Sequence, residues 1–386
     1  MMRSISSEKI AVIAGAHLNA YGIYEALRAC GWSGRIAVIR GADEKFIFGG
    51  LFRDVETWVA RFEKPEDILA LLGEKLGANS RPYIFLTDEQ FHQALIDAKL
   101  QHVLANAVYH VGSEKYLQTI LDRQAFCKFI NDRKLAETPI TLDCGRDPWA
   151  FFGRPFIFRF RYSWDGVKGL DRVRMVTSRQ ELDGLVHEYR QQGFHDESWC
   201  YQEALSAAPE DNVSVCGWHD EHEQLYCVTR TLLRYPPLRG TALVCEKISG
   251  HENLKAQTKA ILSAFEYRGP FEMEFVRDPS SGRFKVIELN PRFWLQHSLA
   301  QQATGYQLML KYMGVGGHIS QPFGRKQYWI NTAHVLARLC LGELSLARYF
   351  CKIDTLRMPG VFKALCILAA ECRYKLRRTL KSGAVL

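Results

Sequence analysis

Two neighbouring stretches, Gly269-Pro-Phe-Glu-Met-Glu-Phe-Val-Arg-Asp278 and Phe284-Lys-Val-Ile-Glu-Leu-Asn-Pro-Arg292, are the most informative part of this chain. Each is an apolar run with regularly spaced polar residues, and a Pro-Ser-Ser-Gly turn at 279–282 separates them. This pattern predicts two antiparallel strands. Because side chains alternate along a strand, Glu272 and Glu274 share one face.

The second strand repeats the arrangement with Glu288 and Asn290. Carboxylate and amide oxygens are the ligands that Mg²⁺ takes, and nucleotide phosphates usually complete its shell. The alternative is an ordinary antiparallel pair with one solvated face. Stacked carboxylates repel each other unless a cation lies between them, yet spacing alone does not decide between the two interpretations.

The residues Glu274, Glu288, Asn290, Pro291 and Arg292 resemble the metal-binding hairpin of the ATP-grasp superfamily, carboxylate-amine ligase type. In that superfamily Glu-x-Asn-Pro-Arg follows an acidic strand residue. The resemblance implies that Glu274, Glu288 and Asn290 bind two Mg²⁺ ions, or Mn²⁺ in their place, which bridge the phosphates of ATP. It also implies that Arg292 lies beside the transferred phosphoryl group or the substrate.

Residues 199–205, Trp-Cys-Tyr-Gln-Glu-Ala-Leu, predict a strand that ends in Gln-Glu. They look like the ATP-grasp hinge, whose backbone meets the adenine edge. In such enzymes an acidic residue seven positions after the hinge Glu binds the ribose, and Glu203 and Glu210 have that interval. By itself, a Gln-Glu strand end is typical of an exposed surface. The nucleotide-binding residues implied here are Gln202, Glu203, Ala204, Leu205 and Glu210.

Residues 153–161 predict a strand that alternates apolar and basic side chains. ATP-grasp chains carry Pro-x-x-x-Lys here, and this chain has Arg159 at the offset of the lysine, with Arg161 on the same face. Arginine keeps the charge but presents a planar fork in place of a compact ammonium. The loop 163–169 resembles the lid that closes on the triphosphate, with Lys168 as its contact, although a surface turn explains it equally well.

An arginine-rich segment at 229–241 supplies Arg230, Arg234 and Arg239. Related amide-forming ligases use such a segment for the γ-phosphate and the carboxylate substrate. On a strand, Arg230 and Arg234 share a face. The alternative is a solvated basic loop. With Arg292, Arg230 and Arg234 form the expected catalytic set.

Apolar residues recur at helical intervals between residues 114 and 134, which predicts a core-facing helix. It is similar to the Asp-Lys helix that opens ATP-grasp domains, with Arg123 in place of the lysine. We assign no catalytic role to Arg123 from the sequence.

The N-terminus predicts a strand at 9–14, a helix at 21–30 and a strand at 35–39, which form a βαβ unit. The loop after the first strand lacks Gly-x-Gly-x-x-Gly, so a dinucleotide site is not indicated. Ligands of parallel sheets bind beyond the carboxyl ends of the strands. His17 and Asn19 are therefore candidates for lining a pocket, and a structural His is the alternative.

The expected fold class is α/β and α+β. The length of 386 residues and the 47% hydrophobic content suit two or three domains. We expect a Rossmann-like pre-ATP-grasp domain at 1–112 and a two-subdomain ATP-grasp fold at 113–310, whose small lid subdomain spans about 140–205. A helical C-terminal extension at 311–386 completes the chain.

The basic charge is concentrated in the tail. Residues 357–386 hold seven Lys or Arg and one acid, a net +6 out of the formal +8 of the chain. A nucleic-acid footprint is therefore not indicated. The tail predicts either a terminal helix docked on the core or a basic amphipathic helix in peripheral contact with an anionic membrane.

The cysteines and the N-terminus indicate a cytoplasmic protein. Eleven cysteines occur with no Cys-x-x-Cys pair, which favours a reducing compartment. Residues 1–9 are polar and no signal peptide is expected, nor is there an apolar span of 18 residues.

The resemblance implies an ATP-dependent carboxylate-amine ligase that acts through an acyl phosphate and releases ADP and phosphate. Its partners would be a small-molecule carboxylate and an amine. The sequence leaves open the identities of both substrates and whether the chain forms an oligomer. Two alternatives remain, namely an ATP-grasp kinase-type phosphoryl transfer and a non-catalytic nucleotide-binding protein.

Overall fold

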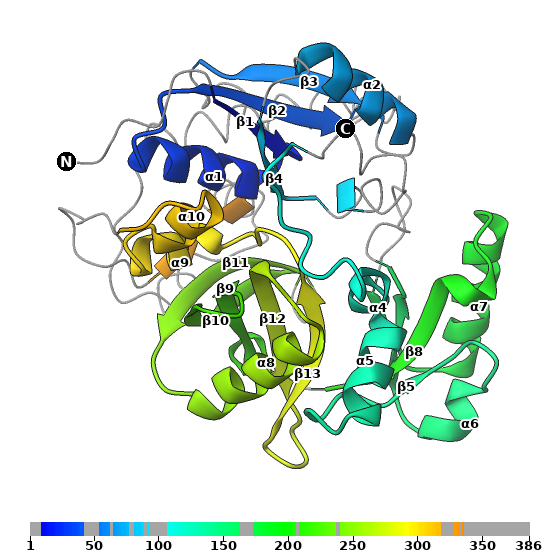
Figure 1. Cartoon of the computed structure of the whole chain (residues 1–386). Helices are drawn as coiled ribbons and strands as arrows, with labels where there is room; N and C mark the ends of the chain where they lie inside the picture. Colours follow the sequence, from blue (N-terminus) through cyan, green and yellow to red (C-terminus); the bar gives the residue numbers. More distant parts are fainter. Residues whose placement is uncertain are drawn as a thin grey trace. The chain divides into compact units, whose positions relative to one another are not determined.

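The computed structural model divides the chain into two compact units, which are described separately below (Figure 1). Unit 1 comprises Met1–His110, Thr231–Lys247 and Phe293–Leu386, and unit 2 comprises Val111–Arg230 and Ile248–Arg292. The structure describes residues 9–41, 54–61, 65–76, 81–88, 91–92, 106–162, 173–205, 208–236, 240–317, 328–331 and 334–335. Lys168, Arg239 and the basic tail at 357–386 lie outside these residues.

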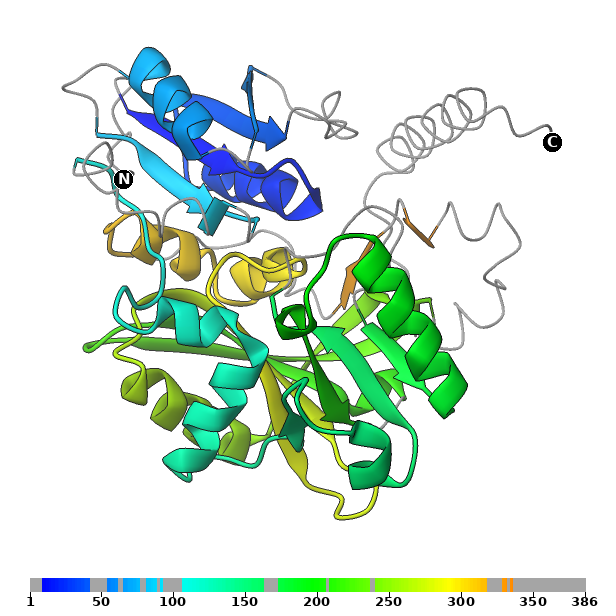
Figure 2. The ribbon, with the colours of Figure 1, turned by 90° about the vertical axis from the view of Figure 1, so that its right-hand side faces the viewer.

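Unit 1 begins with a parallel sheet in the strand order β3-β2-β1-β4, in which β1, β2 and β3 are blue and β4 is cyan in Figures 1 and 2. Every residue of the apolar first strand is buried, as its sequence predicts. The predicted βαβ unit is present. Its elements and the following ones are β1 (Ile10–Ala14), α1 (Leu18–Ala29), β2 (Arg35–Gly41), β3 (Glu56–Ala60), α2 (Pro65–Lys75) and β4 (Tyr83–Leu86).

A glycine is required where β1 ends. Gly15 has φ +113°, and a Cβ atom there would lie 2.3 Å from the hydroxyl oxygen of Thr87. Other residue types rarely adopt this conformation. The close approach lets Thr87, which follows β4, donate a hydrogen bond of 2.6 Å to the carbonyl oxygen of Ala14.

The later parts of the chain in unit 1 include α9 (His297–Ala303), α10 (Gln307–Tyr312), β11 (Thr241–Ile248) and β14 (Tyr328–Ile330). The sequence places residues up to 310 with the ATP-grasp domain, but here α9 and α10 group with the N-terminal sheet. The reason is packing: His297 is fully buried and its Nε2 lies 2.9 Å from the carbonyl oxygen of Asn19 in α1.

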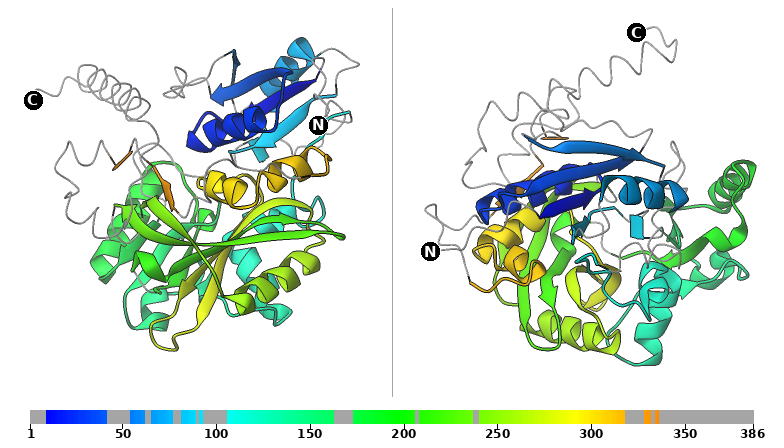
Figure 3. Two further views of the ribbon diagram at one scale, coloured as in Figure 1. Left: turned by 90° about the vertical axis from the view of Figure 1, so that its left-hand side faces the viewer. Right: turned by 45° about the horizontal axis from the view of Figure 1, so that its top comes forward.

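Unit 2 contains an antiparallel sheet in the order β13-β12-β9-β10. One face packs against α5 and α8 in a core that includes Phe126, Phe265, Phe271 and Met273. Figure 3 shows α8 along the yellow hairpin β12–β13. The elements are α4 (Leu117–Leu121), α5 (Arg123–Asp132), β9 (Asn212–His219), β10 (Gln224–Tyr235), α8 (Glu252–Ala264), β12 (Gly269–Arg277) and β13 (Phe284–Asn290).

A second sheet of unit 2 has the order β5-β8-β6-β7, and we call it the small sheet. Aromatic residues of β6 and β8 pack under α7, with Phe158, Phe160 and Trp199 almost fully buried. The green helix α7 lies along this sheet in Figure 2. Its elements are β5 (Thr141–Leu142), α6 (Pro148–Phe152), β6 (Phe156–Phe160), β7 (Val173–Val176), α7 (Arg179–Gln191) and β8 (Trp199–Glu203).

Two short 3-10 turns are present: η2 (Asp196–Ser198) leads into β8, and η3 (Pro209–Asp211) leads into β9. Among the helices that the structure describes, none combines the length and the apolar character needed to cross a bilayer.

Candidate functional site

The register of β12 and β13 brings four polar side chains together. Glu272 pairs with Asn290, and Glu274 pairs with Glu288. Directly opposed residues of antiparallel strands lie on the same face, with Cβ atoms about 5 Å apart. The alternation predicted from the sequence therefore places all four on one face, which we call the acidic face.

The acidic face is not a solvated surface. Its opposite side carries the core residues Phe271 and Met273. Glu272 is only 5% exposed, Asn290 7%, and the Glu288 side chain 17%. An ordinary half-solvated strand pair would expose these polar groups to water, so the structure favours a site over that alternative.

Two carboxylates of this face meet at one amide group. The Nδ2 atom of Asn290 donates to Glu272 Oε2 at 3.2 Å and to Glu274 Oε1 at 3.3 Å. If the side-chain amide of Asn290 were flipped, its Oδ1 atom would take the place of Nδ2 beside the carboxylates of Glu272 and Glu274. These three groups would then present hard oxygen donors to one point. Such donors fit Mg²⁺. Among the described residues, however, no three His, Cys, Asp or Glu side chains are placed to hold a metal ion.

Glu288 is bound by two arginines from distant parts of unit 2. Its Oε2 accepts from Arg159 Nη2 and from Arg123 Nε, both at 2.9 Å. Burial by itself would raise the pKa of Glu288, but the charges of Arg123 and Arg159, with hydrogen bonds to Arg123 and Glu274, lower it to about 2. The carboxylate is therefore ionised at neutral pH. It lies between the side chains of Arg123 and Arg159, each of which is less than one fifth exposed.

Arg159 connects Glu288 to the end of β8. Its Nη1 donates to Gln202 Oε1 at 3.0 Å, and Arg159 as a whole is 7% exposed. Burial and the neighbouring Arg123 lower the pKa of Arg159. Its Nε has no hydrogen-bond partner among the residues described. A buried cationic donor of this kind is suited to an anion, because an unmade hydrogen bond is costly.

The sequence interpretation missed Arg123. Asp122 caps α5 by accepting from the backbone of Gln124 and Ala125, and it also pairs with Arg161. Arg161 is thus occupied in holding the start of α5. Arg123 is turned toward Glu288 instead. The Asp-Arg pair was the available signal, but a helical pattern does not reveal a partner 165 residues away.

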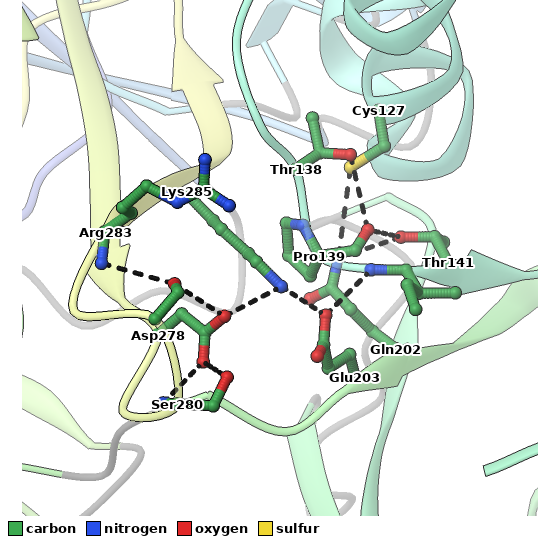
Figure 4. Close-up of polar contacts among 12 residues, drawn as sticks. Cys127, Thr138, Pro139, Thr141, Gln202, Glu203, Asp278, Ser280, Arg283 and Lys285 are labelled. Carbon is green, nitrogen blue, oxygen red and sulfur yellow. Dashed lines mark hydrogen bonds and ion pairs between the residues drawn. The ribbon is translucent and has the colours of Figure 1, made fainter.

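The carboxylate of Glu203 is occupied by donors of this chain (Figure 4). It accepts from Lys285 Nζ at 2.8 Å, from Arg154 Nη2 at 3.1 Å and from the backbone N–H of Ile140 at 3.2 Å. Its side chain therefore joins three segments of unit 2. The neighbouring Ala204 and Leu205 follow the end of β8 and are half-buried.

Glu210 lies in η3, directly before β9. The adjacent Asp211 forms an ion pair of 3.2 Å with Arg277 at the end of β12. Arg292 follows β13 and Pro291 and is half-buried. In unit 1, His17 Nε2 lies 3.5 Å from Asp88 Oδ2, where β1 and β4 end.

The structure does not bring Arg230 to the acidic face. Arg230 pairs with Val213, which pairs in turn with Phe275 of the core. Opposed residues share a face, so Arg230 lies on the opposite side of the sheet from Glu274. Arg234 lies further along β10, in the segment that belongs to unit 1.

Comparison with known proteins gives a family match over the acidic face. The family described as "Carbamoyl-phosphate synthase L chain, ATP binding domain" matches residues 247–320, which include β12 and β13. The carbamoyl phosphate synthase large chain of Thermoanaerobacter pseudethanolicus is 24% identical over 289 residues, covering 69% of this chain and 24% of that relative. This chain thus spans only about a quarter of the length of such relatives.

Solved structures resemble most of the chain. The ADP complex of purK, an N5-carboxyaminoimidazole ribonucleotide synthetase, superposes with a TM-score of 0.62 at 15% identity, covering 89% of this chain and 87% of that one. The L-amino acid ligase from Bacillus licheniformis superposes with a TM-score of 0.58 at 14% identity, covering 80% and 74%. At such identities the likeness establishes the fold.

Proposed function

Because the chain belongs to the ATP-grasp superfamily, we propose that it is an ATP-dependent carboxylate-amine ligase. A carboxylate oxygen of the acid attacks the γ-phosphorus of ATP, and ADP leaves. The amine nitrogen then attacks the carbonyl carbon of the acyl phosphate, phosphate leaves, and the amine proton passes to solvent. The product is an amide or peptide-like bond, with ADP and phosphate as by-products.

The observation that carries the proposal is the convergence on Glu288. Arg159 from the small sheet and Arg123 from the start of α5 both donate to this carboxylate of β13. Two buried guanidinium groups beside an ionised carboxylate form a place where polyphosphate charge can be neutralised. The unpartnered Nε of Arg159 adds a donor for a phosphate oxygen.

The magnesium ligands of the proposal are Glu274, Glu288 and Asn290, and the geometry adds Glu272. Bound Mg²⁺ would neutralise the phosphates and the charge that develops on phosphoryl transfer. In the nucleotide site we place the backbone of Ala204 and Leu205 at the adenine and Glu210 at the ribose. Gln202 orients Arg159.

For the acid substrate we propose Arg292, which follows the acidic face directly. Arg230 and Arg234 are weaker candidates than the sequence suggests, since Arg230 lies on the other side of the sheet. The similar structures support a nucleotide and an amide product only by analogy, through an ADP complex and an enzyme named an amino acid ligase.

The test is a screen of paired acids and amines with Mg²⁺ and ATP, in which ADP, phosphate and the coupled product are measured together. The proposal requires ADP formation that depends on both substrates, together with an amide detected by mass. A phosphorylated acceptor without amide would select the kinase-type alternative. Binding of ADP without turnover over the whole screen would select a non-catalytic nucleotide-binding protein.

A further inference from the structure

The chain passes from the small sheet to the sheet of the acidic face between Glu203, where β8 ends, and Asn212, where β9 begins. We call the described residues between them, 204–205 and 208–211, the connector. Both ends of this connector are held by the hairpin β12–β13. Glu203 pairs with Lys285 of β13 at 2.8 Å, and Asp211 pairs with Arg277 of β12 at 3.2 Å. The connector includes the residues proposed to meet the adenine and the ribose.

The pair at the β8 end is the more buried of the two. The side chains of Lys285 and Glu203 are 12% and 8% exposed, whereas Arg277 is 46% exposed. Burial would lower the pKa of Lys285, but the hydrogen bond and charge of Glu203 raise it. A desolvated pair of this kind has a defined geometry, while exposed pairs contribute little.

Lys285 is itself held in place. Its Nζ lies 3.4 Å from Asp278 Oδ2, between Asp278 and Glu203 in Figure 4. Asp278 accepts from the backbone and hydroxyl of Ser280 at 2.9 and 2.7 Å and from the hydroxyl of Ser281 at 3.0 Å. The turn that joins β12 to β13 thus fixes the direction of the lysine.

A bulge places Lys285 on the acidic face. Glu274 pairs with Glu288 but Phe275 pairs with Val286, so Ile287 is an extra residue of β13. Lys285 pairs with Val276, two residues beyond Glu274, and therefore lies on the same side as Glu288. One strand thus holds the connector through Lys285 and the two arginines through Glu288.

We propose that Lys285 is a positioning residue for the nucleotide: by holding Glu203, it fixes residues 204–205 of the connector at a set distance from the phosphate-binding end of the acidic face. Lys285 acts through Glu203 and needs no contact with the nucleotide. The inference rests on the proposed function and deepens it. The adenine end of the site is then held by Lys285, whereas Arg123 and Arg159 form the phosphate end.

The test compares two ligands by calorimetry on the full chain. ADP occupies the base and phosphate ends, and inorganic tripolyphosphate occupies the phosphate end alone. The variant Lys285→Met should weaken ADP binding about tenfold or more, because small displacements of a positioning group have effects of that size. It should leave tripolyphosphate binding unchanged. Lys285→Arg should restore ADP binding, since it can pair with both carboxylates.

Both variants are expected to fold. In Lys285→Met, Glu203 keeps the Arg154 and Ile140 donors, and Asp278 keeps its serines. The matched control is Lys115→Met, which removes an ion pair with Glu266 whose side chains are 60% and 61% exposed. It should bind both ligands as the wild type does.

Equal ADP binding by Lys285→Met and the wild type would overturn the inference, as would an equal loss of ADP and tripolyphosphate. Each of these results leaves the proposed function standing. A wild-type chain that binds neither ligand would instead overturn the proposed function and this inference with it.

Discussion

Arg159 of β6 donates a hydrogen bond of 2.9 Å to Glu288 of β13, a residue 129 positions further along the chain. The pair joins the small sheet to the acidic face within unit 2. Arg123, at the start of α5, donates to the same Oε2 atom of Glu288. Glu288 therefore joins three segments of unit 2, namely α5, β6 and β13. Its charge state therefore bears on both stability and the proposed chemistry.

The first prediction concerns the variant Glu288→Gln. We expect it to lower the free energy of unfolding by about 3 kcal/mol, because two buried guanidinium groups lose their counter-charge. Coupled formation of ADP should also be lost, at least a hundredfold, if Glu288 binds Mg²⁺. Urea unfolding and a product assay measure the two effects. Glu266→Gln, at an exposed ion pair, is the control and should change neither.

The second prediction concerns how the free energy of unfolding changes as the pH is lowered below 5. The pKa of Glu288 is lowered from 4.5 to about 2 in the folded chain. The unfolded chain therefore takes up the proton first, so the contribution of Glu288 is complete above pH 4.5 and is lost as the pH falls through about 2.

Urea unfolding at pH 5, 4 and 3 checks this prediction. The difference in stability between the wild type and Glu288→Gln should shrink as the pH is lowered through this range. A difference that stays constant with pH would show that the effect of the substitution is not electrostatic.

The acidic face could be predicted because it depends on local alternation. A period of two places Glu272 with Glu274 and Glu288 with Asn290, and antiparallel pairing then brings the two sets together. The alternation of β10 likewise groups Arg230 with Arg234, but it does not say which side of the sheet they occupy. That side depends on the register with β9, which places Arg230 beside Val213.

The contacts that could not be predicted are long-range. Arg123 reaches Glu288 across 165 residues, and Lys285 reaches Glu203 across 82. Arg123 lies outside the apolar pattern that predicts its helix, and Lys285 is separated from Glu288 by an odd number of positions, so a regular strand would place the two on opposite faces. The bulge at Ile287, which decides the side on which Lys285 lies, has no signal in the alternation either.

The third prediction concerns Glu272, which the sequence placed on the acidic face without a role. Its Oε2 shares the Asn290 amide with Glu274. The variant Glu272→Gln should raise the Mg²⁺ concentration needed for half-maximal ADP formation by about tenfold, because a hard cation loses one charged oxygen.

A magnesium titration of the product assay measures this shift, and tripolyphosphate binding without metal serves as the internal control. That binding should be unaffected, because it depends on Arg123 and Arg159, which donate to Glu288. An unchanged magnesium requirement would mean that Glu272 only orients the Asn290 amide.

The last prediction separates Arg159 of β6 from Arg161, which directly follows the end of that strand. Arg159→Lys keeps the charge, but a single ammonium cannot reproduce the bonds to Gln202 and Glu288 that two Nη atoms make. We expect the Kd for tripolyphosphate to rise about tenfold. Arg161→Lys is the control: Arg161 pairs with Asp122 at the start of α5, so its substitution should lower the melting temperature and leave that Kd unchanged. Equal losses of affinity in both variants would contradict this prediction and indicate a general weakening of the segment, since Arg159 pairs with Glu288 whereas Arg161 pairs with Asp122.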